Sequence, residues 1–337
     1  MPSLRSLGVF PLKPCRLAGS NRPLARRVPA EKLSTETAMN TSAPSPAAVW
    51  PGLALAGVGA VAFSGKAIII KLAYRHGVDP VTLIMYRMLF ALPLFLLLAW
   101  WAGRGREPLS RRDLMLVSGL GFIGYYLSSF MDFVGLQYVS AGLERLILYL
   151  NPTLVLLGGW ALYGRRATLR QGLALAVSYL GVLLVFGQEM HFAGPHVALG
   201  AVLVLGSATT YALYLIFSGQ EVRRIGSARL TGWATAIACL LCIAQFLILK
   251  PLSAAAVPAP VLWLSLLNGL LCTFAPVLMV MMAIERIGPA LTSQTGMIGP
   301  LSTITMGVLI LDEQFTPVVV LGTLCVLAGI WLLARAR

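Results

Sequence analysis

The chain has 337 residues, of which 58% are hydrophobic and only 11% are charged, and its mean hydropathy is +0.83. A soluble domain has about a quarter of its residues charged, so this composition excludes an ordinary soluble protein. Backbone groups inside a bilayer find no water, and only helices or a closed barrel satisfy them. The apolar runs are ~20 residues long, which suits helices and not barrel strands. The composition therefore predicts an all-α polytopic membrane protein.

The net charge of +14 raises the question of nucleic-acid binding. Most arginines flank apolar runs, however, which is the pattern of membrane topology and not of a basic binding face. Nucleic acid is therefore not an expected partner. Four of the five cysteines lie in apolar runs, and the Cys239–Cys242 spacing has no partner pair, so packing is favoured over a metal or redox site. No cofactor and no metal are expected.

The first 47 residues are rich in Pro, Ser and Arg and contain no run long enough to cross a bilayer. Seven basic residues, with Glu31 and Glu36 as the only acids, give the segment some likeness to an organelle transit peptide. Two alternatives are a disordered cytoplasmic tail and a start codon assigned too early, with Met39 the real one. Both alternatives are favoured over a transit peptide, because no Arg-rich amphipathic helix is evident.

From Trp50 onward, apolar runs separated by turn-forming residues predict ten transmembrane helices. They cover about 50–72, 80–102, 113–136, 139–162, 169–187, 197–218, 229–249, 259–283, 288–311 and 317–334. A break is expected at Gly288–Pro289, between the eighth run and the ninth. The first five helices are assigned to one repeat over residues 48–188 and the last five to a second over 196–335.

An internal alignment supports this division. Gly135–Leu184 matches Ala283–Leu332 without a gap and places Pro152 on Pro300. Because each repeat has an odd number of helices, the second copy is expected to run inverted through the membrane. The charges agree with an inversion, since the basic corner at residues 164–166 aligns with the acidic corner at residues 312–314.

Arginine placement predicts the orientation in the membrane. Basic residues gather in the loops after the second, fourth and sixth helices, whereas the alternate loops are nearly bare. The loop after the first helix, with Lys71 and Arg75, is the exception. The positive-inside rule therefore predicts that both termini lie in the cytoplasm, and we expect the membrane to be a bacterial inner membrane.

Ionisable residues at membrane depth are costly and usually face a cavity or a partner. Five of them come from four helices of the first repeat: Lys66, Arg87, Asp132, Glu144 and Arg145. Three bases and two acids at one depth predict a buried network with one positive charge left over. Snorkelling to the headgroups, or pairing that only fixes helix packing, is the alternative for Lys66 and Asp132. Coupling or gating is assigned to Lys66, Arg87, Asp132 and Glu144.

Two matched prolines interrupt the fourth and ninth helices and point to a binding site, because broken helices in both repeats mark transporter sites. Helical spacing puts Glu144 and Asn151 on one face, while threonines precede Gly299–Pro300. Tyr211 is a further cavity candidate, with the interfacial aromatic belt as its alternative. The candidate substrate-binding residues are Glu144, Arg145, Asn151, Pro152, Tyr211, Thr292, Gln294, Thr295, Gly299 and Pro300.

A G-x-G-x-x-G pattern at Gly119, Gly121 and Gly124 does not predict dinucleotide binding. That motif requires a preceding strand and a later acid, whereas here the glycines lie within a membrane helix. Close helix packing is the favoured interpretation.

The block YVSAGLERLILYLNPTLVLLGGWALYGRR at residues 138–166, with FMDFVGLQY before it, resembles EamA-type members of the drug/metabolite transporter superfamily. The resemblance implies two EamA units packed as an inverted pair around a central cavity, with alternating access. Family members move amino acids, other small metabolites, nucleotide derivatives or drugs, usually without ATP. Asn151 and Arg165 depart from the family pattern, while Glu313 retains its acidic residue in the second copy.

The leading hypothesis is a secondary active transporter, exporter or permease, of a small polar or charged metabolite, with Glu144 or Asp132 as the proton-coupling acid. A non-transporting membrane scaffold or a membrane enzyme is the alternative. No nucleophile–base set, metal cluster or phosphate loop in the sequence supports an enzyme. The expected partners are a small-molecule substrate and the lipid bilayer, with a homodimer left open.

Overall fold

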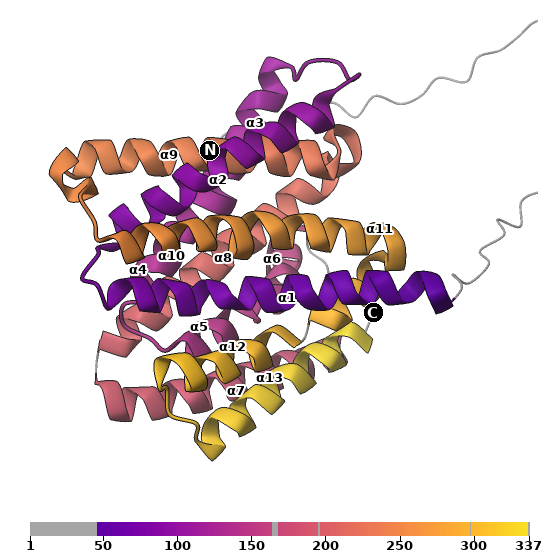
Figure 1. Cartoon of the computed structure of the whole chain (residues 1–337). Coiled ribbons are helices and arrows are strands. Elements are labelled where there is room, and N and C mark those ends of the chain that lie inside the picture. The colour runs from indigo at the N-terminus through magenta and orange to yellow at the C-terminus, as the bar shows by residue number, and fades with distance from the viewer. Residues whose placement is uncertain (1–45, 164–167, 195, 297, 336–337) are drawn as a thin grey trace, which may run out of the picture. The chain divides into compact units, whose positions relative to one another are not determined.

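The computed structural model describes residues 46–163, 168–194, 196–296 and 298–335. Regular secondary structure in these ranges is entirely helical (Figure 1). The first half contains α1 (Pro46–Tyr74), α2 (Pro80–Gly103), α3 (Arg111–Gly121), η2 (Phe122–Leu127), α4 (Ser128–Gly135), α5 (Ala141–Leu148), α6 (Asn151–Tyr163) and α7 (Leu169–Ala193). The second half contains α8 (His196–Ile225), α9 (Ser227–Leu249), η3 (Leu252–Ala255), α10 (Ala259–Gly269), η4 (Leu270–Phe274), α11 (Ala275–Gly296), α12 (Ile298–Leu311) and α13 (Pro317–Arg335).

Within the described residues, eight helical segments are long and apolar enough to cross a membrane. Two further helices, Ile298–Leu311 and Pro317–Leu332, are apolar but shorter. The prediction of an all-α polytopic membrane protein is thereby confirmed. The first 45 residues and the basic corner at 164–166 lie outside the described residues.

The fourth predicted helix is broken, as expected, into α5 and α6. The gap falls at Tyr149 and Leu150, so Pro152 occupies the first turn of α6 and not the middle of a helix. Proline is tolerated there because first-turn N–H groups have no intrahelical acceptor. Before the gap, Ser140 caps α5 by accepting a hydrogen bond from the Leu143 N–H at 3.0 Å.

The break predicted at Gly288–Pro289 is wrong, because α11 continues through both residues to Gly296. Among the described residues α11 ends at Gly296 and α12 begins at Ile298, so Pro300 lies in the first turn of α12. A physical reason lies in the aligned position of the first half. Ser140 supplies a side-chain acceptor that starts a helix there, whereas Gly288 has none.

The two halves pack against each other helix by helix. The most extensive pairs are α7 with α13, α1 with α11 and α2 with α9, each joining one half to the other. In Figure 1 the indigo α1 and the orange α11 run side by side, as do α7 and α13. The largest buried apolar cluster lies among α1, α2, α4, α9 and α10.

Glycines allow helices of the two halves to approach each other closely. A Cβ on Gly121 would meet the backbone of Ala234 in α9, and one on Gly269 would come within 2.9 Å of the Arg87 carbonyl in α2. The register that aligns Pro152 with Pro300 also aligns these two glycines. Gly124 packs directly on the Tyr214 ring. Two of the three glycines of the G-x-G-x-x-G pattern are therefore packing positions.

A π-helical turn interrupts the corresponding helix in each half. The same register aligns Phe122, the first residue of η2, with Leu270, the first residue of η4. In η4 the Thr273 hydroxyl donates to the Asn268 carbonyl at 2.8 Å, across the widened turn. Such turns are rare and occur frequently at functional sites. The η2 turn carries Tyr125, and the η4 turn carries Thr273, whose hydroxyl accepts a hydrogen bond from Arg87.

Candidate functional site

Three of the five predicted ionisable residues form a direct ion triad. The Lys66 ammonium in α1 lies 2.6 Å from Asp132 Oδ2 in α4 and 3.1 Å from Glu144 Oε1 in α5. The three side chains are 7%, 3% and 0% exposed. Because both acids contact one ammonium, this triad carries one net negative charge in a buried environment.

The two arginines complete what we call the ion network: Lys66, Arg87, Asp132, Glu144 and Arg145. Arg145 donates to the Thr303 hydroxyl in α12 at 2.9 Å and to the Phe63 carbonyl in α1 at 2.8 Å. Its guanidinium also stacks over the Phe63 ring, 5.1 Å from the centroid.

Arg87 makes a similar contact on the other side of the network. Its Nε donates to the Thr273 hydroxyl of η4 at 3.0 Å, and its guanidinium lies 5.0 Å from the centroid of the Phe133 ring. Both arginines therefore reach from the first half to a threonine of the second half. Neither guanidinium has a carboxylate within ion-pair distance among the described residues. The ion network thus spans the junction of the two halves, and it keeps one positive charge in excess.

A cavity of about 300 Å³ opens beside the N-terminus of α5, and we call it the α5 cavity. Glu313 from the α12–α13 connection accepts the Ala141 N–H at 2.7 Å and the Gly142 N–H at 3.3 Å. Glu189 of α7 accepts the Ser140 N–H at 3.1 Å and also the Ser140 hydroxyl. Carboxylates at a helix N-terminus are stabilised by its free N–H groups and dipole. One acid from each half therefore holds the start of α5.

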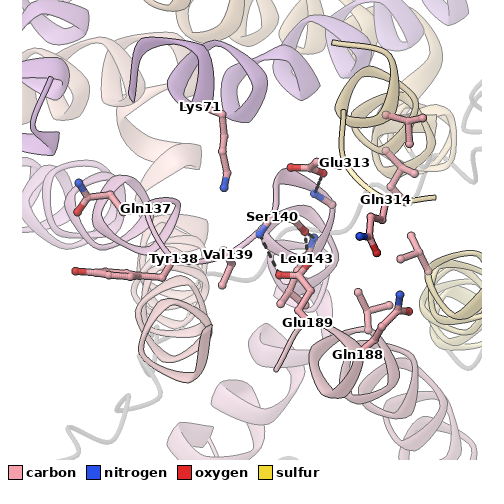
Figure 2. A pocket seen from close by; sticks show the side chains of 15 residues that line it. Lys71, Gln137, Tyr138, Val139, Ser140, Leu143, Gln188, Glu189, Glu313 and Gln314 are labelled. Atoms are coloured by element: carbon pink, nitrogen blue, oxygen red, sulfur yellow. Dashed lines mark hydrogen bonds between the residues drawn. The ribbon is translucent and has the colours of Figure 1, made fainter. Parts of the chain in front are cut away.

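Figure 2 shows the Lys71 side chain extending into the α5 cavity from α1, across from Glu313. Leu143 and Ile304 line the same cavity. In the sequence Leu143 precedes Glu144 of the ion network, and Ile304 follows Thr303, which Arg145 contacts. Sequence reasoning did not select Lys71, Glu189 or Glu313 as site residues. The signal that was available is the Ser140 helix start, together with acids at the ends of two apolar runs.

A second cluster, the tyrosine cluster, consists of Tyr125, Tyr211 and Tyr214. The Tyr125 hydroxyl donates to that of Tyr214 at 3.3 Å, and their ring centroids lie 5.0 Å apart. Tyr211 stacks on Tyr214 at 5.6 Å. The predicted site residue Tyr211 therefore packs among aromatic hydroxyls contributed by α8 and η2.

The repeat register relates this cluster to the ion network. It aligns Phe63 and Lys66 of α1 with Tyr211 and Tyr214 of α8. It also aligns Tyr125 of η2 with Thr273 of η4. Phe63, Lys66 and Thr273 thus correspond by the repeat to Tyr211, Tyr214 and Tyr125, so an ammonium site on one side of the junction is matched by an aromatic cluster on the other.

The remaining predicted residues lie at the start of α6, at the end of α11 and at the start of α12. The Asn151 Oδ1 atom is buried and has no hydrogen-bond partner among the described residues. The Gly299 carbonyl accepts from the Ser64 hydroxyl at 2.9 Å and from that of Thr303 at 3.2 Å, so the start of α12 contacts the network.

The other members of this set differ in exposure. Pro300 and Thr292 are buried, Thr295 is half-buried and Pro152 is exposed. The side chain of Gln294 lies outside the description.

All-helical architecture, apolar spans and a buried ion network together define a polytopic membrane protein. The EamA-like transporter family model matches residues 50–187 and again residues 198–335, and the chain belongs to this family. The expected EamA resemblance is thereby confirmed. The two matched stretches keep the register that aligns Pro152 with Pro300.

Curated relatives agree with the family. The uncharacterized transporter YcbK of Bacillus subtilis (strain 168) is 33% identical over 276 residues, which cover 79% of this chain and 86% of YcbK. The uncharacterized transporter YoaV of the same organism is 24% identical over 264 residues, covering 76% of this chain and 88% of YoaV. A solved crystal structure aligns with a TM-score of 0.57 at 17% identity, covering 86% of this chain and 98% of that chain, which shows the fold alone.

Proposed function

We propose that this chain is a secondary active transporter, which moves a small polar or charged metabolite across the membrane by alternating access. In this proposal the eight long spans and the two shorter apolar helices form two inverted five-helix repeats, over residues 48–188 and 196–335. The termini lie in the cytoplasm and the membrane is a bacterial inner membrane. Family membership and the names of the curated relatives support transport in general.

The observation that carries the mechanism is the ion network at the junction of the halves. Every charged member belongs to the first half, and its links to the second half run through the neutral hydroxyls of Thr273 and Thr303. Separating two charges at low dielectric costs far more than breaking a hydrogen bond to a neutral hydroxyl. The arginine–threonine contacts can therefore break and re-form during a conformational change while the triad of Lys66, Asp132 and Glu144 stays intact.

Coupling to protons is assigned to Glu144 or Asp132, the two acids that share Lys66. A proton on one carboxylate would leave Lys66 bound to the other and would cancel the negative charge of the triad. Such a change of charge at the junction gives a proton gradient a way to bias the two arrangements of the halves. A non-transporting scaffold needs no such arrangement, and no observation in the structure favours it.

Purified protein in proteoliposomes, supplied with a metabolite mixture under an imposed pH gradient, tests both parts of the proposal. We expect one class of solute to accumulate, and Glu144→Gln or Asp132→Asn to abolish gradient-driven accumulation while exchange of labelled solute continues. Glu107→Gln, at an exposed acid of the α2–α3 loop, is the matched control. Absence of any solute movement would overturn transport, whereas unchanged accumulation in both variants would overturn only proton coupling.

A further inference from the structure

The ion network contains a buried donor that nothing in the described part of the chain satisfies. Arg87 is 6% exposed, and its Nη1 atom has no hydrogen-bond partner. The guanidinium is held in place by the bond from its Nε to Thr273 and by the Phe133 ring. A buried charged donor without an acceptor is costly, and protein interiors rarely leave one empty.

The charge balance points to the same conclusion independently. Both acids of the network are held by Lys66, at 2.6 Å and 3.1 Å, so neither compensates an arginine by direct contact. Arg87 and Arg145 bind only neutral oxygens in the described structure. One positive charge is therefore left over at membrane depth, where an anion would be bound strongly.

Buried acceptors without a hydrogen-bond partner also occur among the described residues: Asp132 Oδ1 and both Glu144 oxygens in the network, and the side-chain oxygen of Asn268, the residue to which the hydrogen-bond chain from Arg87 leads. Thr273 accepts from Arg87 and donates to the Asn268 carbonyl. The Asn268 side-chain oxygen is buried and has no partner among the described residues. A ligand that offers an acceptor to Arg87 and a donor to Asn268 would fill both positions. A carboxylate next to a hydroxyl or amine has this chemistry.

We propose that the ion network binds a small organic carboxylate, with the carboxylate accepting hydrogen bonds from Arg87 and its charge balanced by the excess positive charge of the network. This inference rests on the proposed transport function, because it names the substrate class of the same site.

Ligand binding to purified protein in detergent tests the proposal without requiring transport. Thermal unfolding is measured in low-chloride buffer with acetate, lactate, pyruvate, succinate, alanine and glutamate, each beside the amide in which every carboxylate is replaced by a carboxamide. We expect at least one acid to raise the midpoint while its amide does not. Because a charge-assisted hydrogen bond is lost, Arg87→Gln should weaken the affinity for that acid about tenfold or more.

Three controls keep the test decisive. Arg87→Lys preserves the charge and guards against a folding defect, and Arg111→Gln removes an exposed arginine at the start of α3. Sodium chloride and sodium sulfate serve as inorganic anions. The proposal is overturned if no acid protects better than its amide, if chloride protects as well as the best acid, or if Arg87→Gln retains full affinity.

Transport assays on the same variants separate this inference from the proposed function. Carboxylate binding without solute movement would support the site and overturn the transporter. Accumulation of a neutral or cationic solute, equal in the wild type and in Arg87→Gln, would support the transporter and overturn the carboxylate site.

Discussion

The Lys66 site of the ion network and the tyrosine cluster stand at positions that the repeat aligns, yet they hold together by different forces. Lys66 contacts two carboxylates, whereas Tyr214, its aligned residue, makes ring contacts and shares a hydrogen bond between hydroxyls. Buried charges depend on one another, because removing one partner leaves the other desolvated and unpaired. Neutral aromatic clusters lose only local packing and a modest hydrogen bond. We therefore expect the stability of the protein to be sensitive to single substitutions in the ion network and tolerant of them in the tyrosine cluster.

Breaking the triad should have the largest effect. Lys66→Met leaves Asp132 and Glu144 buried without a cation, and removing one member of a buried pair typically costs ~3–5 kcal/mol. We expect a large fall in the unfolding midpoint of the purified protein, measured by denaturant titration in detergent. The triple variant Lys66→Met/Asp132→Asn/Glu144→Gln should recover most of that loss. Equal destabilisation in the single and triple variants would contradict the dependence of the acids on Lys66.

The close packing of α3 on α9 at Gly121 should be the next most sensitive feature. In Gly121→Ala the added methyl group meets the backbone of Ala234, which cannot turn aside. Overpacking of this kind costs ~1–3 kcal/mol. Gly119→Ala is the matched control two residues away, because a Cβ there has nothing within 4 Å. Similar unfolding midpoints for the two variants would show that α3 and α9 are not packed this closely.

The tyrosine cluster should tolerate a change that the ion network does not. Tyr125→Phe keeps the ring and removes only the hydroxyl that donates to Tyr214 at 3.3 Å. A neutral hydrogen bond contributes about 0.5–1.5 kcal/mol, so the unfolding midpoint should fall slightly. A loss in Tyr125→Phe as large as that in Lys66→Met would refute the contrast between the junctions. Tyr214→Phe alone and with Tyr125→Phe completes a double-mutant cycle for the pair.

The smallest expected effect concerns pH and the start of α2, outside the spans. Burial raises the pKa of the Asp79 carboxyl, but hydrogen bonds from Thr82 and Lys250 outweigh burial and set it below the usual value. A lowered folded-state pKa gives stability that is complete above the unfolded pKa of about 4 and is lost as pH falls through the folded value.

Asp79→Asn should therefore reduce the fall of the unfolding midpoint that the wild type shows as the pH drops below about 4. The helix aligned with α2 provides an internal comparison, because α9 begins after Gly226 without a side-chain cap. Ser227→Ala at its first residue should leave the acid response unchanged. An identical acid response in Asp79→Asn and the wild type would show that Asp79 contributes nothing there.

The sequence placed Lys66, Asp132 and Glu144 in one network because a charge at membrane depth is costly without a partner. Snorkelling was the alternative for Lys66 and Asp132, and the ion pairs of Lys66 with both acids favour the network. Helix packing determines which carboxylates Lys66 contacts. It also determines that both arginines bind threonines of the other half. Periodicity within one helix carries no information about the neighbour that helix will meet.

The helix ends show a similar limit. A proline pattern placed a break at Gly288–Pro289, but the cap that starts α5 is Ser140, and its aligned residue Gly288 cannot provide one. The role of Glu313 depended equally on tertiary structure, because its bonds to α5 join residues far apart in the sequence. The two π-helical turns left no signal, since neither Phe122–Leu127 nor Leu270–Phe274 differs in composition from ordinary apolar helix.

The two aligned π-helical turns, η2 and η4, also bear on how the two halves evolved. A π-helical turn amounts to one extra residue accommodated within a helix, and the extra residue stands at the same register in both halves. One insertion in a single ancestral unit, copied when that unit was duplicated, accounts for both turns with a single event. The ammonium site and the tyrosines differ between the copies, so at least one of them arose after the duplication. The distortion of the helix is therefore older than at least one of the two side-chain clusters beside it.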